Sequence, residues 1–266
     1  MKHLLLDPKF DHLMPFAQNL HQTFKHSGRG IHSGRNQLKT FRVEDQMYCI
    51  KSFGRPTLAN TLIYSFFRKG KAERSYLYAQ QLLKLGINTP QPIGYIEIYN
   101  GWRMMTNSYY ISLYEPPAYT IAQVIKDNVL HKESILQDFA SFIATELHAN
   151  GVYHKDFNGK NILVYPHANN HYTFSLVDLN RIRFNQKINF RKALVNIKSV
   201  CANPIDLATL SGYYAHERHT DPTQAMFQII TIKYMASKMR HLKKSFLRGL
   251  KSLFDFKMST TKVKWH

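Results

Sequence analysis

Three oxygen-bearing side chains stand out in the middle of the sequence. Asp156 and Asn161 lie in the stretch GVYHKDFNGKNILV, and Asp178 ends the later stretch FSLVD. Mg²⁺ in proteins is held by oxygen ligands, usually one or two carboxylates together with substrate phosphates. A carboxylate beside such a site can also take the proton of an attacking hydroxyl. The residue types therefore indicate a magnesium-phosphate site, although an Asp or Asn in a loop is more often a turn former.

These side chains can meet only if a helix followed by a hairpin positions them. The segment ESILQDFASFIATELHANG predicts the helix, because its apolar residues recur on one stripe and Gly151 is a suitable C-terminal cap. The stripe consists of Ile135, Leu136, Phe139, Ile143 and Leu147. The apolar runs NILVY and FSLVDL then predict the hairpin. A further helix is expected over 120–129, and helices again from about residue 200.

The sequence before residue 115 predicts antiparallel strands with one helix. QLKTFRV and MYCIKSF, joined by the polar EDQ, predict a hairpin whose second strand carries Lys51. KAERSYLYAQQLLKLG has helical apolar spacing and closes at Gly86, and a second hairpin turns at Asn100-Gly101. The paired prolines of EPPAYT continue neither a strand nor a helix, so they predict a boundary between two lobes.

Composition and charge limit the possible functions of the protein but do not select one. The chain has 266 residues, and 44% of them are hydrophobic, which excludes disordered and fibrous classes. Lys and Arg outnumber Asp and Glu by 36 to 17, so nucleotides, nucleic acids and anionic lipid headgroups would all be attracted. Cys49 and Cys201 have neither disulfide-framework nor zinc-site spacing. Without a signal peptide or a membrane-spanning apolar run, we expect a cytoplasmic protein, with contact to a membrane surface left open.

Several motifs together resemble those of protein kinases. HKDFNGKNIL is similar to the catalytic loop H-R-D-L-x-x-x-N, VDLN to D-F-G, and YCIK to the V-A-I-K strand. With the KAERSY helix, GINTPQPIGY and LVDLNR, they resemble the bacterial lipopolysaccharide core kinases of the Kdo/WaaP type. The resemblance covers roughly residues 28–184. It implies ATP and Mg²⁺ as cofactors and phosphorylation of an inner-core sugar on a lipid-linked acceptor.

The resemblance also assigns roles to individual residues. Lys51 would hold the α- and β-phosphates of ATP, and Glu73 would orient Lys51 through an ion pair. Asp156 would accept the proton of the acceptor hydroxyl. Asn161 and Asp178 would bind the metal, with Asp178 bridging metal and phosphates. Taken alone, Lys51 could equally be an ordinary charge at the end of a strand.

The chain departs from the kinase motifs at several positions. Gly28, Gly30 and Gly34 in SGRGIHSGRN do not match G-x-G-x-x-G, so a phosphate-covering loop is only one interpretation and a plain surface loop the other. Asn158 stands where protein kinases have a lysine, which argues against a protein substrate. Asn180 replaces the glycine of D-F-G and should stiffen that segment.

The catalytic-loop motif contains further residues with expected roles. We expect His154 to brace the loop rather than take part in chemistry. Since Asn158 lacks a charge, Lys160 or Lys155 would have to supply one near the γ-phosphate.

Two basic segments leave alternatives open. The region after Asp178 has no acidic residue before Asp206, and it either recognises a polyanionic acceptor or forms a solvated basic loop. Its cations are Arg181, Arg183, Lys187, Arg191, Lys192 and Lys198. Near the C-terminus, a helical stripe is surrounded by seven Lys or Arg residues. This stripe is formed by Met235, Met239, Leu242, Phe246 and Leu250. We expect it to pack on the core, with its cationic rim toward a membrane as the alternative.

The sequence thus predicts a bilobal, protein-kinase-like α+β fold. Its parts are an extension (1–25), an ATP-binding N-lobe (26–114), a linker (115–119) and a C-lobe (120–266). The expected function is phosphorylation of a Kdo or heptose hydroxyl of lipopolysaccharide, at the cytosolic face of the inner membrane. The alternatives are a kinase of a protein or small molecule, and a catalytically silent basic membrane- or nucleic-acid-binding module. Nucleic acid is not expected as a partner, because the chain has no RNP-like, zinc-finger or helix-turn-helix signature.

Overall fold

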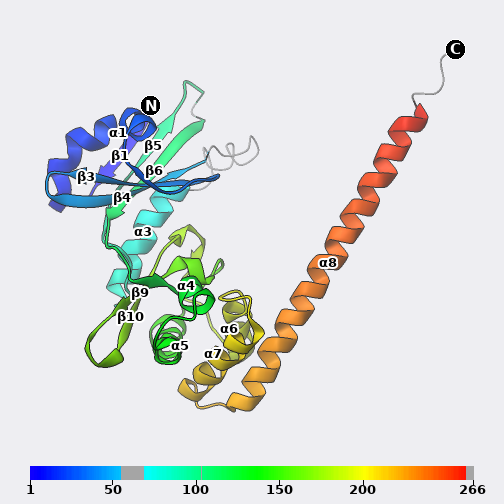
Figure 1. The fold of residues 1–266 in the computed structure, drawn as a ribbon. Coiled ribbons are helices and arrows are strands. Elements are labelled where there is room, and N and C mark those ends of the chain that lie inside the picture. Colours follow the sequence, from blue (N-terminus) through cyan, green and yellow to red (C-terminus); the bar gives the residue numbers. More distant parts are fainter. Residues whose placement is uncertain (55–68, 103, 262–266) are drawn as a thin grey trace.

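The computed structural model describes residues 1–54, 69–102 and 104–261, which form two lobes and a projecting helix (Figure 1). The strands of the N-terminal lobe are β1 (Lys2–Leu6), β2 (Arg29–His32), β3 (Gln37–Val43), β4 (Gln46–Phe53), β5 (Pro92–Tyr99) and β6 (Met105–Leu113). They form one six-stranded sheet in the order β1-β5-β6-β4-β3-β2, and neighbouring strands are antiparallel.

Strand β4 has two differently buried faces, and this determines where Lys51 points. Tyr48 and Ile50 are buried in the core of the N-terminal sheet, whereas Phe53 is buried in the larger core that continues into the C-terminal lobe. Because successive side chains of a strand point to opposite faces, Lys51 shares the face of Phe53. Lys51 is thereby directed toward the second lobe.

Residues 1–25 are not a separate extension, which corrects that part of the predicted division. β1 pairs with β5 along its whole length, so it forms an edge of the sheet. The 3₁₀ turn η1 (Pro8–Leu13) and helix α1 (Met14–His26) follow, and Phe24 of α1 packs against Phe41 and Tyr109. The early Asp7-Pro8 break hid the strand, because it leaves only the short run HLLL as a signal.

Helix α3 (Lys71–Lys84) connects the two lobes. It lies beneath the sheet and reaches the C-terminal lobe in Figure 1, and it lies close to β5, β6 and the turn η5 (Leu179–Arg181). Ala72, Tyr76, Ala79 and Leu82 of α3 are buried in the same core as the C-terminal helices. The helix ends at Lys84 with Leu85 as its C-cap, and the following Gly86 has a φ of +74°, which is favourable for glycine.

The C-terminal lobe is mainly helical and contains two small antiparallel ladders. Its helices are α4 (Ile121–Lys126), α5 (Lys132–Ser141), the π-helical η2 (Phe142–His148), α6 (Phe190–Ile197), α7 (Pro204–Glu217) and α8 (Pro222–Thr261). Its strands are β7 (Tyr119–Thr120), β8 (Tyr153–His154), β9 (Ile162–Pro166), β10 (Tyr172–Leu176) and β11 (Ile182–Arg183), and its short turns are η3 (Gly159–Asn161), η4 (Ala168–Asn170) and η5. β9 and β10 form the predicted hairpin, and β8 pairs with β11.

The C-terminal helix does not pack its apolar stripe on the core, so that expectation was wrong. Figure 1 shows α8 leaving the C-terminal lobe as one long helix that projects away from both lobes. Met235, Met239, Leu242 and Phe246 are all exposed. The side chain of Leu250, the fifth predicted member of the stripe, lies outside the described part of the chain.

Candidate active site

Lys51 and Asp178 are in direct contact, although 127 positions separate them in the sequence. The Lys51 ammonium donates a hydrogen bond of 2.5 Å to Asp178 Oδ1, and both side chains are largely shielded from solvent. β4 brings the cation from the first lobe, and the end of β10 brings the carboxylate from the second. A cation and a carboxylate placed together at the junction of two lobes can bind a phosphate and its metal from opposite sides.

Asp178 is held in a special conformation by its neighbours. Its backbone is left-handed, with φ = 58° and ψ = 50°, which costs an L-residue other than glycine about 1 kcal/mol. Asn180, which is 9% exposed, donates a 2.7 Å hydrogen bond to the same Oδ1 that accepts from Lys51. The sequence predicts that Asn180 stiffens the segment after Asp178, and this hydrogen bond is a contact that can do so. The Asn180 amide fixes the direction of the Asp178 carboxylate.

His154 ties the catalytic loop to the segment before Asp178. It is completely buried, its Nε2 lies 3.3 Å from the Val177 carbonyl oxygen, and its Nδ1 accepts the Asp156 backbone N–H at 3.1 Å. Nδ1 is therefore the unprotonated nitrogen and Nε2 the donor. Burial lowers the pKa of His154, which keeps the ring neutral in this role. His154 thus braces the loop, as expected from the sequence.

Asp156 and Asn161 are brought next to Asp178 by this brace and by backbone contacts. The Val177 N–H donates to the Asn161 carbonyl at 3.0 Å, and the Asn161 side-chain amide donates to the Asp156 carbonyl at 2.9 Å. Within the described residues the Asn161 Oδ1 accepts no hydrogen bond, so it can face a cation. The Asp156 side chain is 43% exposed, and its Oδ2 lies 3.6 Å from Arg181 Nη1. Asp156 therefore presents a solvent-accessible carboxylate at the site.

A chain of buried polar groups connects the catalytic loop to the helices and supports it. The sequence did not predict this chain. Asn196 of α6 donates to the His154 carbonyl at 2.7 Å, and its Oδ1 lies 3.1 Å from His148 Nε2. His148 Nδ1 lies 3.0 Å from the Tyr214 hydroxyl, which accepts from Arg218 at 2.9 Å. Burial lowers the pKa of His148 to about 4. An Asn and a His near the ends of two helices were the only sequence signals, and they do not reveal this connection.

Additional cations that the motifs did not identify surround the Lys51–Asp178 pair. Both Lys51 and Lys71 lie over the ring of Phe53, at 5.3 and 6.0 Å from its centre. Burial lowers the pKa of Lys71, and repulsion from Arg35 and Arg181, among other cations, lowers it further, while Asp178 opposes the shift. Cations that repel one another at a shared site favour a polyanionic ligand. Their sequence signal was only the general basic character of the chain.

Gly28, Gly30 and Gly34, the glycines considered for a phosphate-covering loop, lie at different positions along the β2–β3 hairpin. Gly34 is in its turn, and the adjacent Arg35 carbonyl lies so close to Gly54, at the end of β4, that a Cβ there would be 2.1 Å away. Gly28 lies at the opposite end of β2 and Gly30 inside the strand. The turn that contains Gly34 therefore lies nearest to the end of β4, the strand that carries Lys51.

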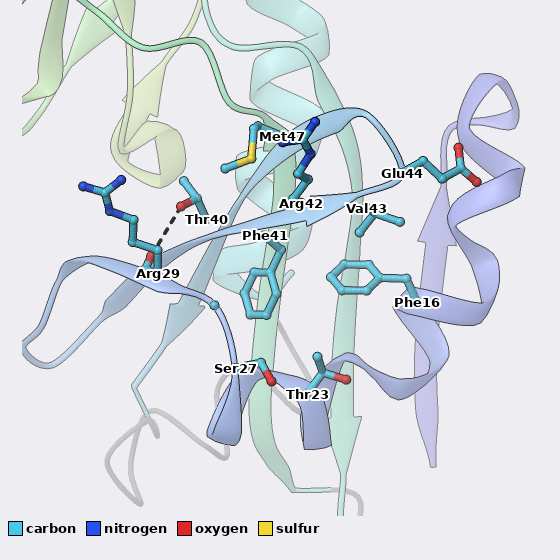
Figure 2. A pocket seen from close by; sticks show the side chains of 11 residues that line it. Phe16, Thr23, Ser27, Arg29, Thr40, Phe41, Arg42, Val43, Glu44 and Met47 are labelled. Atoms are coloured by element: carbon cyan, nitrogen blue, oxygen red, sulfur yellow. Dashed lines mark hydrogen bonds between the residues drawn. The ribbon is translucent and has the colours of Figure 1, made fainter.

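Gly28 has a packing reason of its own. Its φ is +87°, and a Cβ would lie 2.5 Å from the Phe41 ring. Figure 2 shows Phe41 in a surface hollow between α1 and the β2–β3 strands, with Ser27 and Arg29 beside it. Lys51, Asp156 and Asp178 do not line this hollow. The local packing alone accounts for glycine at this position.

Glu73 is not joined to Lys51 among the described ion pairs. Its carboxylate lies 3.2 Å from Lys69, while Lys51 pairs with Asp178. Glu73 does lie where the motif requires, in the first turn of α3. That turn begins at Gly70, where any Cβ would lie 1.8 Å from the buried Glu97 carboxyl group, so only glycine fits there.

Comparison with known proteins gives the family. The sequence pattern described as "Lipopolysaccharide kinase (Kdo/WaaP) family" matches residues 42–198, more than half of the chain, and this range includes Lys51, Asp156 and Asp178. The chain belongs to this family. The resemblance drawn from the motifs is therefore confirmed, and the lipopolysaccharide kinase family member described here is a phosphotransferase. A search of curated proteins found no match.

One solved structure shares the fold of this family member, and two others match it less well. One described as "WaaP in complex with acyl carrier protein" covers 91% of this chain and 98% of its own, at 14% identity and a TM-score of 0.56. The match to a crystal structure of WbdD covers 79% of this chain and 45% of WbdD. The match to a Rio2 kinase complex from Chaetomium thermophilum covers 94% of this chain and 78% of the Rio2 chain. Both matches have 12% identity and a TM-score of 0.46. The predicted protein-kinase-like α+β fold is therefore confirmed. Within the described residues, no helix is both long and apolar enough to traverse a bilayer.

Proposed function

We propose that this kinase transfers the γ-phosphoryl group of ATP to a hydroxyl of an inner-core lipopolysaccharide sugar, with Kdo preferred over heptose. The acceptor would be linked to lipid A at the cytosolic face of the inner membrane. The observation that carries the proposal is the 2.5 Å contact between Lys51 of one lobe and Asp178 of the other, beside the accessible carboxylate of Asp156. Family membership supports the reaction class.

Each residue of the site has a role suited to its chemistry. Lys51 would bind the α- and β-phosphates, with Lys71 and Arg35 adding positive charge nearby. Asp156 would accept the hydroxyl proton of the acceptor as the oxygen attacks the γ-phosphorus and the bond to the β-phosphate oxygen breaks. Transfer of this kind depends mainly on positioning and on neutralising charge, which agrees with a site rich in cations.

The donor set at Asp178 and Asn161 fits Mg²⁺. It offers one carboxylate and one amide oxygen, and substrate phosphates and water complete such sites. When bound there, Mg²⁺ would neutralise charge on the phosphates. Asn180 would hold the Asp178 carboxylate toward the metal, and the Asn161–Asp156 hydrogen bond would hold the second ligand.

Glu73 and the hairpin turn would complete the nucleotide site. We propose that Glu73 becomes the partner of Lys51 when phosphates and metal occupy Asp178, since α3 already contacts η5 next to that residue. The turn containing Gly34 would cover the phosphates, because it reaches the end of β4. Gly28 and Gly30 would contribute only as parts of the strand that carries this turn.

A polyanionic acceptor is supported by the basic segment after Asp178. β11 pairs Arg183 with Tyr153, three positions before Asp156, and Arg183, Lys187 and Arg191 are exposed. Part of the segment is helix α6 rather than a loop. Exposed cations next to the base would attract the carboxylate and phosphate groups of a Kdo-bearing lipid A.

The direct test is phosphorylation of a defined acceptor. Purified protein with ATP and Mg²⁺ should add one phosphate to Kdo-lipid A, detected by mass spectrometry, and heptose-containing acceptors should react more slowly. Lys51→Met should abolish the product, whereas Lys126→Gln, an exposed lysine on α4, should not change it. ATP hydrolysis without acceptor phosphorylation would assign a different acceptor, and absence of ATP binding would refute the kinase assignment for this chain.

A further inference from the structure

The first turns of helix α8 are packed against the C-terminal lobe, whereas its later turns expose large apolar side chains. Ala225 and Ile229 are fully buried against the C-terminal lobe, and the Lys233 ammonium donates a hydrogen bond to the Cys201 carbonyl. Beyond this point the exposure changes: Met235, Met239, Leu242 and Phe246 are 56%, 66%, 57% and 67% exposed. These four large apolar side chains, together with Leu247 at 53%, therefore face solvent on a helix whose first turns are fixed to the lobe.

The exposed part of α8 has an apolar face and a cationic face. The four apolar residues recur at intervals of four, three and four, so at 3.6 residues per turn they form one stripe about 17 Å long. The opposite side of the helix is cationic, and two further lysines flank the stripe. The opposite cations are Arg240, Lys244 and Arg248, and the flanking lysines are Lys238 and Lys243.

The charge of this segment selects what can cover the stripe. The sequence has no acidic residue between Asp221 and Asp255. If two copies paired through their stripes, the flanking Lys238 and Lys243 of both helices would border the same seam with no acidic residue opposite them, which opposes self-association. An apolar face with Lys and Arg around the rest of the helix is typical of helices that lie in the interface of an anionic bilayer. Such a surface needs no shape complementary to the stripe.

We propose that residues 235–248 of α8 dock the protein on an anionic phospholipid bilayer, with the stripe inserted among the acyl chains and the cations at the headgroups. The buried first turns would hold the C-terminal lobe at a fixed position relative to that surface. The proposal rests on the proposed function in one respect: the lipid-linked acceptor would then lie in the same bilayer as the helix.

The test uses the full chain and vesicles of stated composition. The protein should co-sediment with vesicles of phosphatidylcholine containing 30% phosphatidylglycerol, and binding should weaken with salt and on phosphatidylcholine alone. Because one cation near such a surface contributes about fivefold in affinity, replacing Lys238, Arg240, Lys243 and Lys244 together by Gln should weaken binding by about a hundredfold or more. Leu242→Gln with Phe246→Gln should also release the protein at unchanged charge.

A matched control removes the same number of charges elsewhere. Lys9, Lys25, Lys84 and Lys126, exposed lysines outside α8, are replaced together by Gln, and binding should change by no more than a few-fold. Equal losses in this control and in the α8 charge variant would mean that net charge, not α8, binds the vesicles. Equal urea midpoints of all variants would show that folding is intact.

Two further readouts separate this inference from the proposed function. If both hold, the α8 variants lose turnover of a vesicle-embedded acceptor but keep turnover of a deacylated, water-soluble one. Vesicle binding without turnover of either acceptor would reject the proposed function only. Turnover of the embedded acceptor with no dependence on α8 would reject the docking role. Concentration-dependent dimerisation lost in the stripe variant, or binding to an acidic protein but not to vesicles, would also overturn it.

Discussion

At the scale of single residues, the site is a set of oxygens whose directions are fixed by their neighbours. The Asp178 carboxylate accepts from both Lys51 and Asn180 on one oxygen, and Asp156 is held through its backbone by His154. The Asp156 carboxylate itself is left accessible beside Arg181. Asp156, the proposed general base, is therefore positioned through its main chain, while its side chain stays accessible.

The role of Asp156 as general base predicts a specific kinetic defect. Asp156→Asn keeps the shape of the side chain but removes proton acceptance, so kcat should fall by about 10²–10⁴-fold. The KM for ATP should change only a few-fold, since Asp156 is not assigned to nucleotide binding. Asp127→Asn, on the exposed end of α4, is the matched control. Unchanged steady-state turnover of Asp156→Asn would show that the base is misassigned.

Asn180 should determine how well the site holds its metal. In Asn180→Gly the Asp178 carboxylate loses its 2.7 Å hydrogen bond, and loss of such a supporting contact typically weakens metal affinity by about tenfold or more. The Mg²⁺ concentration giving half-maximal activity should rise accordingly, with a smaller change in maximal rate at saturating Mg²⁺. A magnesium titration with no shift would contradict the orienting role of Asn180.

At the scale of elements, helix α6 supports the catalytic loop through one buried amide. Asn196 donates to the His154 carbonyl and lies within hydrogen-bond distance of His148 in η2. α6 contacts the loop directly, η2 and α7 are joined to it through His148 and Tyr214, and apolar packing holds the three elements together. The polar chain thus fixes the loop relative to three helical elements.

Removing that amide should affect both stability and rate. Asn196→Leu leaves the His154 carbonyl and the His148 ring nitrogen without partners, which should lower the free energy of unfolding by about 2 kcal/mol or more. A displaced loop should also lower kcat by about 10²-fold well below the melting temperature, with ATP affinity unchanged. Urea unfolding and single-turnover kinetics measure the two effects, with exposed Asn150→Ala as the control. If stability falls but kcat does not, Asn196 has only a structural role.

At the scale of the whole molecule, acid should weaken the fold through His148. Its pKa is about 4 in the folded state, because of burial and of repulsion from Arg218 and Lys192, whereas an unfolded histidine has a value near 6.5. The unfolded chain therefore binds a proton over this interval and the folded chain does not. Stability should be full above pH 6.5 and should fall by about 3 kcal/mol toward pH 4.

Urea unfolding at several pH values tests this dependence. His148→Gln should be less stable at neutral pH but flatter between pH 6.5 and 4. The exposed His12→Gln should keep the slope of the wild type. Identical slopes in all three proteins would place the acid sensitivity elsewhere, for example at the buried His154.

The sequence predicted those parts of the fold and the site that depend on local spacing. The β3–β4 hairpin, α3, the α5–η2 helical run and the β9–β10 hairpin follow from residue periodicity and from turn and cap residues. β1 was missed because an edge strand of five residues has too little pattern of its own. The support of the loop by Asn196 and the cations around Phe53 were missed because they join residues that only the packed helices and strands bring together.

The sequence by itself determined the residue types, the motif spacing and thereby the kinase family, because these depend on neighbours along the chain. Only the tertiary structure decided that Lys51 contacts Asp178 while Glu73 contacts Lys69, and that the apolar stripe of α8 is exposed. The physical reason is that ion-pair choice and burial depend on distances between side chains that are remote in sequence. An amphipathic pattern states that a helix has an apolar face, but the packing of the whole chain decides what covers it.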